Sequence, residues 1–591
     1  MINMASKKKT IQGDKIAVAA IDFGTTCTGY AYYLKKDRRQ NLLTSINIDQ
    51  AWDGSAKLGL QAPTTVLMDE KKQFHSFGFE AETKYKSLTL TDDHKGWYYF
   101  QYFKMSLYHG QDLSLGMKLT DSEGKTMEAI TIFSEAIKYV HGHLLKRLKD
   151  ALVDEIRPDQ ISWVITVPAI WRDSAKQFMR EAAVKAGISS ADLMLALEPE
   201  CAAIYCKEVA LKQKEGVDGV FLSVFNPNEK YLVCDLGGGT VDTTIHVVKA
   251  NGKLEEIYAA TGGDWGGQNV NAAFERLLEE MIGQKSFSLF RDKYANAWIK
   301  LQTYFETCKR QFTVKTDKSD IDLPTAFEEL CRDRAWREGV EVINGTLRLS
   351  KTVMSDLFSV ATNQIIRHIE RLMEKALLPK HSSILLVGGF SESTIVKQQI
   401  RSHFRGSKVI APESAGSAII KGSVMFGIDR DIIAARVSPY TYGVHTRRYY
   451  NKRIHPAERR NVVKGKEYVE NAFCIQIVKG ALVYVGSEPK GNTFTIVNST
   501  NGEVFWKVYQ SEKENPKFCD DEGTHKIGML KVVIPETLRN KKISLKVTMT
   551  CHGTELEAKA CIVDFPNAVV RTNLDFLSRG YALAGDFIEE D

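Results

Sequence analysis

Two distant segments of the chain repeat one local pattern: an apolar strand, an aspartate, a turn of glycine and threonine, and a second strand. The first reads AAIDFGTTCTGYAYY from Ala19, and the second reads YLVCDLGGGTVDTTIHVV from Tyr231. Each predicts a β-hairpin. Glycine lets the backbone of such a turn approach a ligand closely, and successive free N–H groups form a concavity for an anion. A phosphate group is the expected ligand of this turn.

One such hairpin alone is typical of an ordinary Asp/Gly turn between strands. Two of them, each opening one half of a long α/β region, favour a nucleotide held between the halves. The chain has neither a GxxxxGK[ST] motif nor a GxGxxG motif after a strand, which excludes a P-loop protein. The residues expected at the phosphates are those of the two turns: Gly24, Thr25, Thr26, Gly237, Gly238, Gly239 and Thr240.

An aspartate ends the first strand of each hairpin, at Asp22 and at Asp235. A bare carboxylate beside a phosphate is repelled unless a divalent cation lies between them. Mg²⁺ keeps several of its waters and takes few protein ligands, so the two aspartates are predicted to hold its hydration shell. The hydroxyls of Thr25 and Thr240 are expected to bond phosphate oxygens.

Short Val/Ile-rich strands alternate with helical segments from residue 15 to about residue 427, which predicts an α/β fold with parallel βα units. The run WVITVPA from Trp163 is one such strand. A helix is predicted over 173–186, closed by Gly187, and others over 271–282, 293–312 and 393–404. After Pro439 strand-like runs such as FCIQIV, ALVYVG and NTFTIVN follow at short intervals and predict an antiparallel β domain.

Composition restricts the class of protein. At 591 residues and 43% apolar composition the chain predicts a globular protein of several domains. Ten cysteines without a CxxC pair, and no apolar run of about 18 residues, favour a reducing compartment without a membrane span. We expect the protein in the cytoplasm, with the nucleus as second candidate.

The net charge of +6 is too diffuse to predict nucleic-acid binding. The local basic run RRYYNKRIHPAERR, from Arg447, is interpreted as a solvated loop, with a binding patch as the alternative.

Four motifs together resemble the seventy-kilodalton heat-shock protein family of the actin-like ATPase superfamily. They are AIDFGTTCTGYAY, YLVCDLGGGTVDTTI, ITVPAIWRDSAKQFMREAAVKAGI and ILLVGGFSESTIVKQQI. The resemblance implies a two-lobed actin-like ATPase domain that binds ATP or ADP with Mg²⁺. It also implies a smaller antiparallel β-sandwich for a protein or peptide client, and co-chaperones or nucleotide-exchange factors as further partners.

The resemblance also assigns roles to single residues. Glu198, in LALEPECAAIY, is expected near the metal and the attacking water, and Lys104 at the γ-phosphate, with Asp235 and Thr240 completing the catalytic set. Taken alone, Lys104 is equally an ordinary surface lysine. The turn GGDWGGQNVN contributes Gly263 to nucleotide binding. The adenosine is expected between the Gly388–Gly389 turn and a clamp in FETCKRQF, formed by Glu306, Lys309 and Arg310.

Without the family, the three charges of that clamp are one solvated helix face. The domain boundaries expected from the resemblance are a basic tail, the ATPase domain, a linker, the β domain and a C-terminal tail, at 1–14, 15–430, 431–437, 438–566 and 567–591.

Three departures from the family are apparent. Phe390 and Glu392 stand in the adenosine motif where the family usually has serine and arginine. In the linker, Ala434, Ala435 and Arg436 replace leucines and an aspartate, which predicts a weaker apolar contact between linker and ATPase domain. No helical lid is expected after the β-sandwich. These departures indicate the divergent twelve-type subgroup.

The function expected is an ATP-binding, slowly hydrolysing chaperone-like switch that couples nucleotide state to a protein or peptide partner. Two alternatives stay open. One is a nucleotide-dependent scaffold without hydrolysis, and the other is a small-molecule kinase of the same superfamily.

Overall fold

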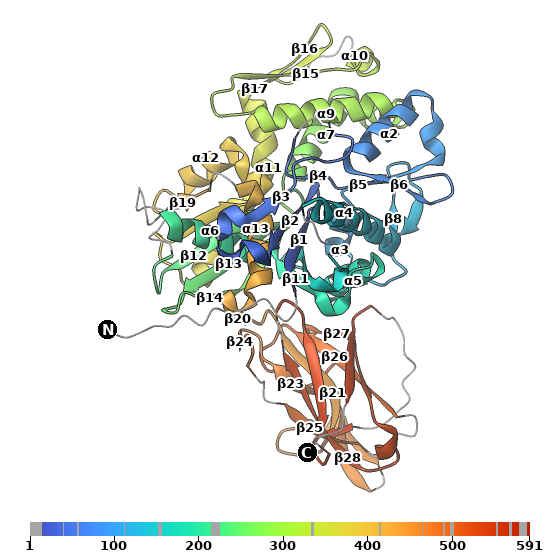
Figure 1. Cartoon of the computed structure of the whole chain (residues 1–591), viewed down its shortest axis with the longest axis vertical. Helices are drawn as coiled ribbons and strands as arrows, with labels where there is room; N and C mark the ends of the chain where they lie inside the picture. The colour runs from blue at the N-terminus through green and yellow to red at the C-terminus, as the bar shows by residue number, and fades with distance from the viewer. Residues whose placement is uncertain are drawn as a thin grey trace.

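The structure is a computed structural model of the 591-residue chain. Helices and strands alternate as far as Ile428, and strands dominate after it (Figure 1). The expected mixed α/β content is confirmed. The residues described are 15–39, 41–55, 58–110, 113–151, 156–213, 225–331, 336–412, 415–463, 465–487, 491–496, 502–550, 553–565, 570–577 and 588–590.

The first sheet carries the first hairpin. Its strands, in spatial order, are β11 (Leu193–Leu197), β10 (Ile161–Val167), β1 (Ala17–Phe23), β2 (Cys27–Leu34) and β3 (Ile46–Ile48). β1 pairs antiparallel with β2 within the hairpin and parallel with β10 on its other side. Every residue of β1 is buried, as expected of a strand covered on both faces.

The second sheet repeats this arrangement around the second hairpin. Its strands, in spatial order, are β19 (Val409–Ile410), β18 (Ser383–Val387), β12 (Lys230–Leu236), β13 (Val241–Val248), β14 (Leu254–Gly263), β20 (Ile433–Val437) and β24 (Leu482–Tyr484). β12 pairs antiparallel with β13 and parallel with β18. The strand β12 therefore has the same two kinds of neighbour as β1.

Two helices, α6 (Glu198–Gln213) and α13 (Ala415–Ile428), join the sheets through a shared apolar core. That core includes Val18 of β1 and Val233 of β12. A methyl group on Gly422 of α13 would lie 1.7 Å from the carbonyl oxygen of Cys201 in α6, so only glycine lets the two helix backbones approach this closely. The position of one sheet relative to the other depends on this contact.

The remaining helices cover the outer faces of the sheets. α4 (Ala129–Ala151) and α5 (Asp173–Lys185) share a core with the first sheet. Those on the second sheet include α7 (Gln268–Ile282), α9 (Ala295–Gln311), α11 (Lys351–Lys375) and α12 (Thr394–His403). α5 matches the predicted helix, and Gly187 follows it with φ of +99°, the left-handed conformation expected just beyond a helix end. No helix of the described residues combines the length and apolar character that a membrane crossing requires.

The predicted linker is an inner strand of the second sheet. β20 pairs parallel with β14 and antiparallel with β24, which belongs to the C-terminal part of the chain. Ile433 and Ala435 are fully buried. Strand pairing uses the backbone and does not need leucine side chains, so the weaker apolar contact expected at the linker stays a prediction.

Beyond the linker the chain forms strands around a core that contains Phe494 and Trp506. No α-helix occurs among the described residues after Ile428. The strands used below are β21 (Thr441–Tyr449), β22 (Arg460–Val463) and β23 (Lys466–Ile477); β21 pairs antiparallel with β23. The expected strands FCIQIV and NTFTIVN are found here, whereas ALVYVG supplies β24 and pairs with the linker.

The terminal segments differ from the expectation in one respect. The segment expected as a C-terminal tail contains β30 (Arg571–Asp575), which pairs antiparallel with β27 (Thr524–Val533), and β31 (Ile588–Glu590), which pairs with β25 (Asn492–Ile496). Both strands add to the C-terminal sheet. The expected basic tail at 1–14 lies outside the described residues.

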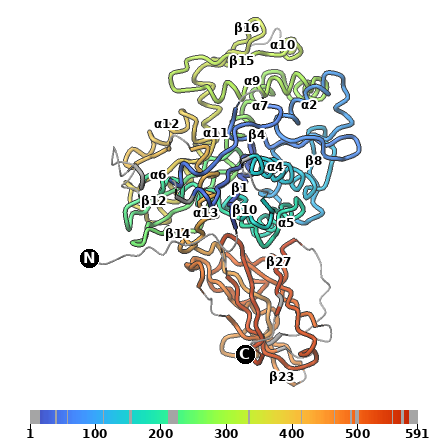
Figure 2. Tube along the Cα trace, in the orientation of Figure 1, coloured from blue at the N-terminus to red at the C-terminus, as the bar shows by residue number. Residues whose placement is uncertain are grey.

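One face of α5 contacts the C-terminal domain. Tyr442 donates from its hydroxyl to Asp173 Oδ2 at 3.1 Å, and Arg180 Nε donates to Glu555 Oε1 at 2.7 Å. Asp173 and Arg180 are seven residues apart, so they lie on the same side of the helix. Figure 2 shows the C-terminal strands below α5.

Candidate functional site

The two hairpin turns face each other in direct contact. A methyl group on Gly238 would lie 2.1 Å from Thr26 Oγ1, and one on Gly239 would lie 2.7 Å from Thr25 Oγ1. Gln268 Nε2 also donates to Thr26 Oγ1 at 3.4 Å. The structure thus brings together four of the residues predicted at the phosphates, two from each sheet. The glycine of the first hairpin turn, Gly24, lies against the carbonyl of Cys27 at the start of the next strand.

A glycine-rich segment before α7 supports the second turn. Gly266 N donates to Gly239 O at 3.0 Å, and Gly267 N donates to Gly237 O at 3.1 Å. Both glycines were missed by sequence reasoning, which selected Gly263. That residue instead ends β14, where it pairs with Val241 and lies against the ring of Trp265. The sequence signal that could have identified Gly266 and Gly267 was the WGGQ run directly before a helix.

The predicted adenosine turn adjoins the same hairpin. Gly388 has φ of +81°, and a methyl group on it would lie 2.2 Å from Asp235 Oδ1. Gly389 has open space at the corresponding position. The ring of Phe390 points instead into the core of the second sheet, stacked on Phe358 with centroids 6.4 Å apart.

Glu392, the second departure in this motif, has a structural contact. Its Oε1 accepts a hydrogen bond from Gly416 N at 3.2 Å, in the first turn of α13. The two unusual residues of the adenosine motif therefore hold the turn to the second sheet and to α13.

Four carboxylates are buried beside one lysine below the turns. Lys104 is 3% exposed, and its Nζ lies 2.6 Å from Glu198 Oε1. This burial excludes the interpretation of Lys104 as an ordinary surface lysine. Nζ also lies 5.3 Å from the centroid of the Trp171 ring, which covers it. The buried carboxylates are those of Asp22, Glu198, Asp235 and Asp242.

The hydrogen bonds of these carboxylates differ. Asp22 accepts from Thr166 Oγ1 at 2.8 Å and from Gln61 Nε2 at 3.1 Å. Asp235 Oδ1, in contrast, is buried without a hydrogen-bond partner. A buried oxygen that lacks a partner is costly unless a ligand satisfies it. Asp235 is therefore the group of this site that most needs a partner from outside the chain.

The pKa values show the same excess of negative charge. Burial, and then repulsion from Glu198, raises the pKa of Asp22 to about 6. The same two causes raise the pKa of Asp235 well above its ordinary value, and that of Asp242 to about 7. One lysine does not balance four carboxylates.

Asp242 was missed by sequence reasoning. It lies opposite Asp235 in the second hairpin and accepts from Ile170 N at 2.9 Å. The hydroxyl of Thr240 also bonds its carboxylate. The signal that could have identified it was an acidic residue within a strand whose other residues, apart from His246, are apolar or hydroxylated.

These groups fit a hydrated Mg²⁺ ion. The partnerless oxygen of Asp235 and the unbalanced carboxylates provide acceptors for metal-bound water and a negative field for the cation. Among the described residues no group of three His, Cys, Asp or Glu side chains is arranged for direct coordination.

The three clamp residues meet one another on α9. Glu306 Oε2 lies 2.6 Å from Lys309 Nζ, and Glu306 Oε1 lies 2.9 Å from Arg310 Nε. Burial alone would raise the pKa of Glu306, but Lys309 and Arg310 together lower it. Lys309 also donates to Asn271 Oδ1 of α7 at 2.8 Å and is buried, so it is not part of a solvated helix face.

A second buried ionic group lies at the linker. Arg436 donates to both carboxylate oxygens of Glu200, through Nε at 2.6 Å and through Nη2 at 2.7 Å. Glu256 Oε2 accepts from Val437 N at 2.8 Å. Burial, and then repulsion from Glu200, raises the pKa of Glu256 to about 8. The arginine that departs from the family's linker thus forms a bidentate, buried ion pair.

Two sheets that each carry a glycine-turn hairpin, joined by shared helices, have the architecture of an actin-like ATPase. A family model described as Hsp70 protein matches residues 114–481. The human protein named Heat shock 70 kDa protein 12A is 32% identical to the chain, over 98% of the chain and 94% of its own length. The human protein named Heat shock 70 kDa protein 12B is 30% identical, over 95% and 91%.

A Chaperone protein DnaK of Thermoplasma volcanium is 27% identical over 55% of the chain and 50% of its own length. The chain belongs to the Hsp70 family, and this homology indicates nucleotide-binding ATPase activity. Its identity to the 12A and 12B proteins over nearly the full length supports a divergent twelve-type member, as the sequence predicted.

Gly238→Ala tests the contact between the hairpin turns. The new methyl group would clash with Thr26 Oγ1, so we expect a loss of about 1–3 kcal/mol in stability together with weaker nucleotide binding. Thr26→Ala removes that oxygen. The melting temperature of the double variant, measured by scanning calorimetry, should therefore return most of the way to that of the native protein. If Gly238→Ala melts like the native protein, the turns do not touch in solution.

Glu256→Gln tests the linker by pH. The pKa of Glu256 is raised in the docked state, so its stabilisation is complete below pH 4.5 and is lost as the pH rises through about 8. Amide-exchange protection of β20, corrected for intrinsic rates, should fall between pH 6 and pH 8. Glutamine can still accept from Val437 N but cannot ionise, so this fall should be smaller in the variant. An equal fall in both proteins would contradict the assignment.

Proposed function

We propose that the chain is an ATP-binding, slowly hydrolysing switch whose nucleotide state controls the grip of its C-terminal domain on a polypeptide partner. One observation carries the proposal: glycine turns from two sheets meet beside the buried Lys104–Glu198 pair. Membership of the Hsp70 family supports a nucleotide as the ligand of this site. In this proposal the two sheets and their helices are the lobes of the ATPase domain, and the C-terminal strands form a β-sandwich.

The chain's residues have distinct tasks in this proposal. Backbone N–H groups of the two turns, with the hydroxyls of Thr25 and Thr26, bind phosphate oxygens. Asp22 and Asp235 hold Mg²⁺ through water, and the cation neutralises phosphate charge when bound. Lys104 and Glu198 orient the attacking water. Such positioning supplies most of the catalysis in phosphoryl transfer, so no covalent step on the protein is required.

The adenosine is proposed to lie beside α9. Arg310 and the Gly388–Gly389 turn flank the base, because Gly389 leaves open space and Gly388 adjoins the second hairpin. Glu306 and Lys309 face the ribose. Their mutual ion pair fixes both side chains before the ligand arrives, which reduces the ordering cost of binding.

The first turn of α6 links the phosphates to the linker. Glu198 contacts Lys104 on one side, and Glu200, two residues later, binds Arg436. A shift of Glu198 on loss of the terminal phosphate therefore moves the carboxylate that holds the linker. The residues of α5 that contact the C-terminal domain supply a second mechanical connection.

Calorimetric titration with ATP tests the nucleotide site. With Mg²⁺ the native chain should bind ATP, and binding should weaken strongly when the cation is removed. Asp235→Ala removes one of the two carboxylates proposed to hold the hydrated ion, so the affinity of the variant for ATP should depend less on Mg²⁺ than that of the native chain. Equal heats in both proteins would mean that the site has been misassigned. Glu392→Gln is a matched control, because its carboxylate contacts the start of α13 rather than the phosphates.

A single-turnover experiment with radiolabelled ATP separates the switch from a scaffold without hydrolysis. The proposed switch should release phosphate faster than buffer does, and Lys104→Met should abolish that excess because it leaves the water without its cationic partner. Release at the buffer rate with normal ATP binding would favour the scaffold.

Arg436→Met tests the coupling. It leaves Glu200 buried without its partner, which costs about 3 kcal/mol, so β20 should lose amide-exchange protection and ATP should lose its effect on partner binding. The double change Glu200→Met with Arg436→Met replaces both charges and should recover most of the protection.

Arg348→Met is the matched control. Arg348 forms a similarly bidentate pair with Asp320, but both side chains are exposed, and exposed pairs contribute little to stability. If Arg436→Met is as mild as this control, the buried pair does not hold the linker.

A further inference from the structure

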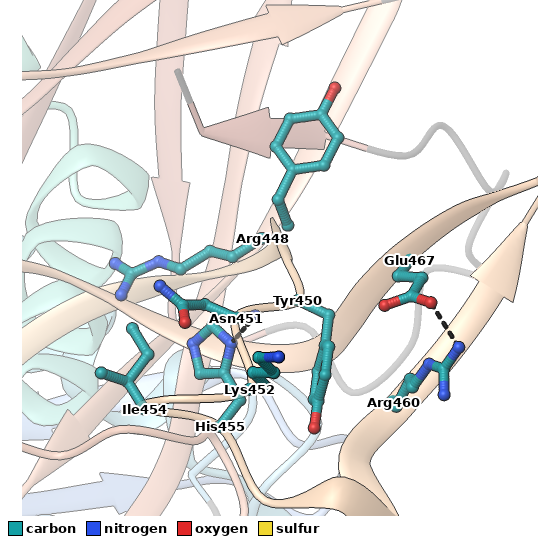
Figure 3. A pocket seen from close by; sticks show the side chains of 9 residues that line it. Arg448, Tyr450, Asn451, Lys452, Ile454, His455, Arg460 and Glu467 are labelled. Carbon is teal, nitrogen blue, oxygen red and sulfur yellow. Dashed lines mark hydrogen bonds and ion pairs between the residues drawn. The ribbon is translucent and has the colours of Figure 1, made fainter.

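The basic run of the C-terminal domain lines most of an open hollow of about 840 Å³. The hollow lies between the loop that follows β21 and the start of β22 (Figure 3). Sequence reasoning treated this run as a solvated loop, yet its residues converge on one space. The lining residues are Arg448, Tyr449, Tyr450, Asn451, Lys452, Ile454, His455, Arg460 and Glu467.

The loop around the hollow is held in one conformation by its own hydrogen bonds. Asn451 O accepts from Ile454 N at 3.1 Å and from His455 N at 2.9 Å. Asn451 N donates to His455 Nδ1 at 3.0 Å, and Asn451 Oδ1 accepts from Arg453 N at 3.0 Å. Such local bonds make a tight turn. The hollow is therefore pre-formed, which lowers the cost of binding.

The lining carries an excess of positive charge. Its single carboxylate, Glu467, is already paired with Arg460. Lys452 lines the hollow and Arg453 follows it in the same loop; in the described part of the chain neither forms an ion pair. Burial, and then the nearby charges of Arg448 and Lys517, lowers the pKa of His455, consistent with a positive field. A negatively charged ligand complements this surface.

Apolar groups lie beside these charges. Tyr449 is 53% exposed, Ile454 62% and Val462 56%, and all three belong to β21, the loop or β22. Exposed side chains of this size and this close in the fold mark an interaction surface when polar groups surround them. The ligand should therefore carry apolar side chains as well as negative charge.

An open strand edge adjoins the hollow. β22 pairs only with β23 among the described residues, and Arg460, its first residue, lines the hollow. Alternate residues of an edge strand direct N–H and C=O groups outward, where an extended peptide can pair with them. This edge favours a polypeptide over a nucleic acid or a lipid surface, because neither of those presents a backbone that pairs with a strand.

We propose that this surface binds an extended acidic segment of a partner protein, in which carboxylates alternate with aromatic or aliphatic side chains. The segment pairs with the free edge of β22, its carboxylates meet Lys452 and Arg453, and its apolar side chains cover Tyr449 and Ile454. Alternation suits a strand, because successive side chains point to opposite faces. The inference rests on the proposed function only in taking a polypeptide as the partner.

The probe is a labelled decapeptide of alternating Glu and Phe with blocked ends, and binding is measured by fluorescence anisotropy on the full chain. Lys452→Glu with Arg453→Glu should weaken binding about tenfold, since two attractive charges become repulsive. Lys541→Glu with Lys542→Glu makes the same charge change at two exposed lysines elsewhere in the domain and should change binding by less than about twofold.

Two altered peptides test the inference without changing the protein. Gln in place of Glu should weaken binding about as much as the charge-reversal variant. N-methylation at alternate residues keeps the charge and removes strand pairing, so it should also weaken binding. Binding that is equal for the native chain and Lys452→Glu/Arg453→Glu overturns the proposal, and so does equal affinity for the Gln peptide.

Two competitors test the other ligand classes. If single-stranded DNA or vesicles rich in anionic phospholipid displace the peptide at much lower concentration and show the same dependence on Lys452 and Arg453, the surface belongs to that class instead. ATP titration of the same samples keeps the two proposals apart. Loss of peptide binding with normal ATP heat refutes this inference alone, whereas absent ATP heat with normal peptide binding refutes the proposed function alone.

Discussion

An imbalance of buried charge dominates this molecule: three carboxylates from the two sheets and a fourth, Glu198, at the start of α6 are buried beside one lysine. Lys104 neutralises Glu198, and hydrogen bonds stabilise Asp22, but Asp235 Oδ1 is left without a partner. A folded protein retains such an arrangement only where the surrounding structure enforces it. Here the enforcement is visible, since Asp22 and Asp235 end strands that are buried on both faces and the sheets are held together by the α6–α13 contact.

Helix α6 contacts both the buried ionic site and the linker. Its first turn places Glu198 beside Lys104 and Glu200 beside Arg436. The linker strand is paired through its backbone with β14 on one edge and β24 on the other, and Arg436 within it forms the buried ion pair with Glu200.

Much of the fold was legible from the sequence because it rests on local signals. The hairpins, the helix ended by Gly187 and the mixed α/β content follow from periodicity and turn chemistry. The contacts that could not be predicted join residues that are far apart in the chain. Nothing local marks Glu200 and Arg436, 236 positions apart, as partners, or sends the run ALVYVG to the linker instead of its own domain. Two local signals were also overlooked: the acidic residue in the strand that contains Asp242 and the WGGQ run before α7.

Burial separates the two kinds of charged cluster in this chain. Charges below the hairpin turns and at the linker are desolvated, so each unpaired group is costly and the arrangement selects a specific partner: a hydrated cation or an arginine. Charges around the C-terminal hollow are solvated, so leaving Lys452 unpaired costs little and attraction to a ligand is correspondingly weak and dependent on salt. Strand pairing and apolar contact must then supply most of the affinity there, which is why an open edge and exposed aromatic side chains lie beside those cations.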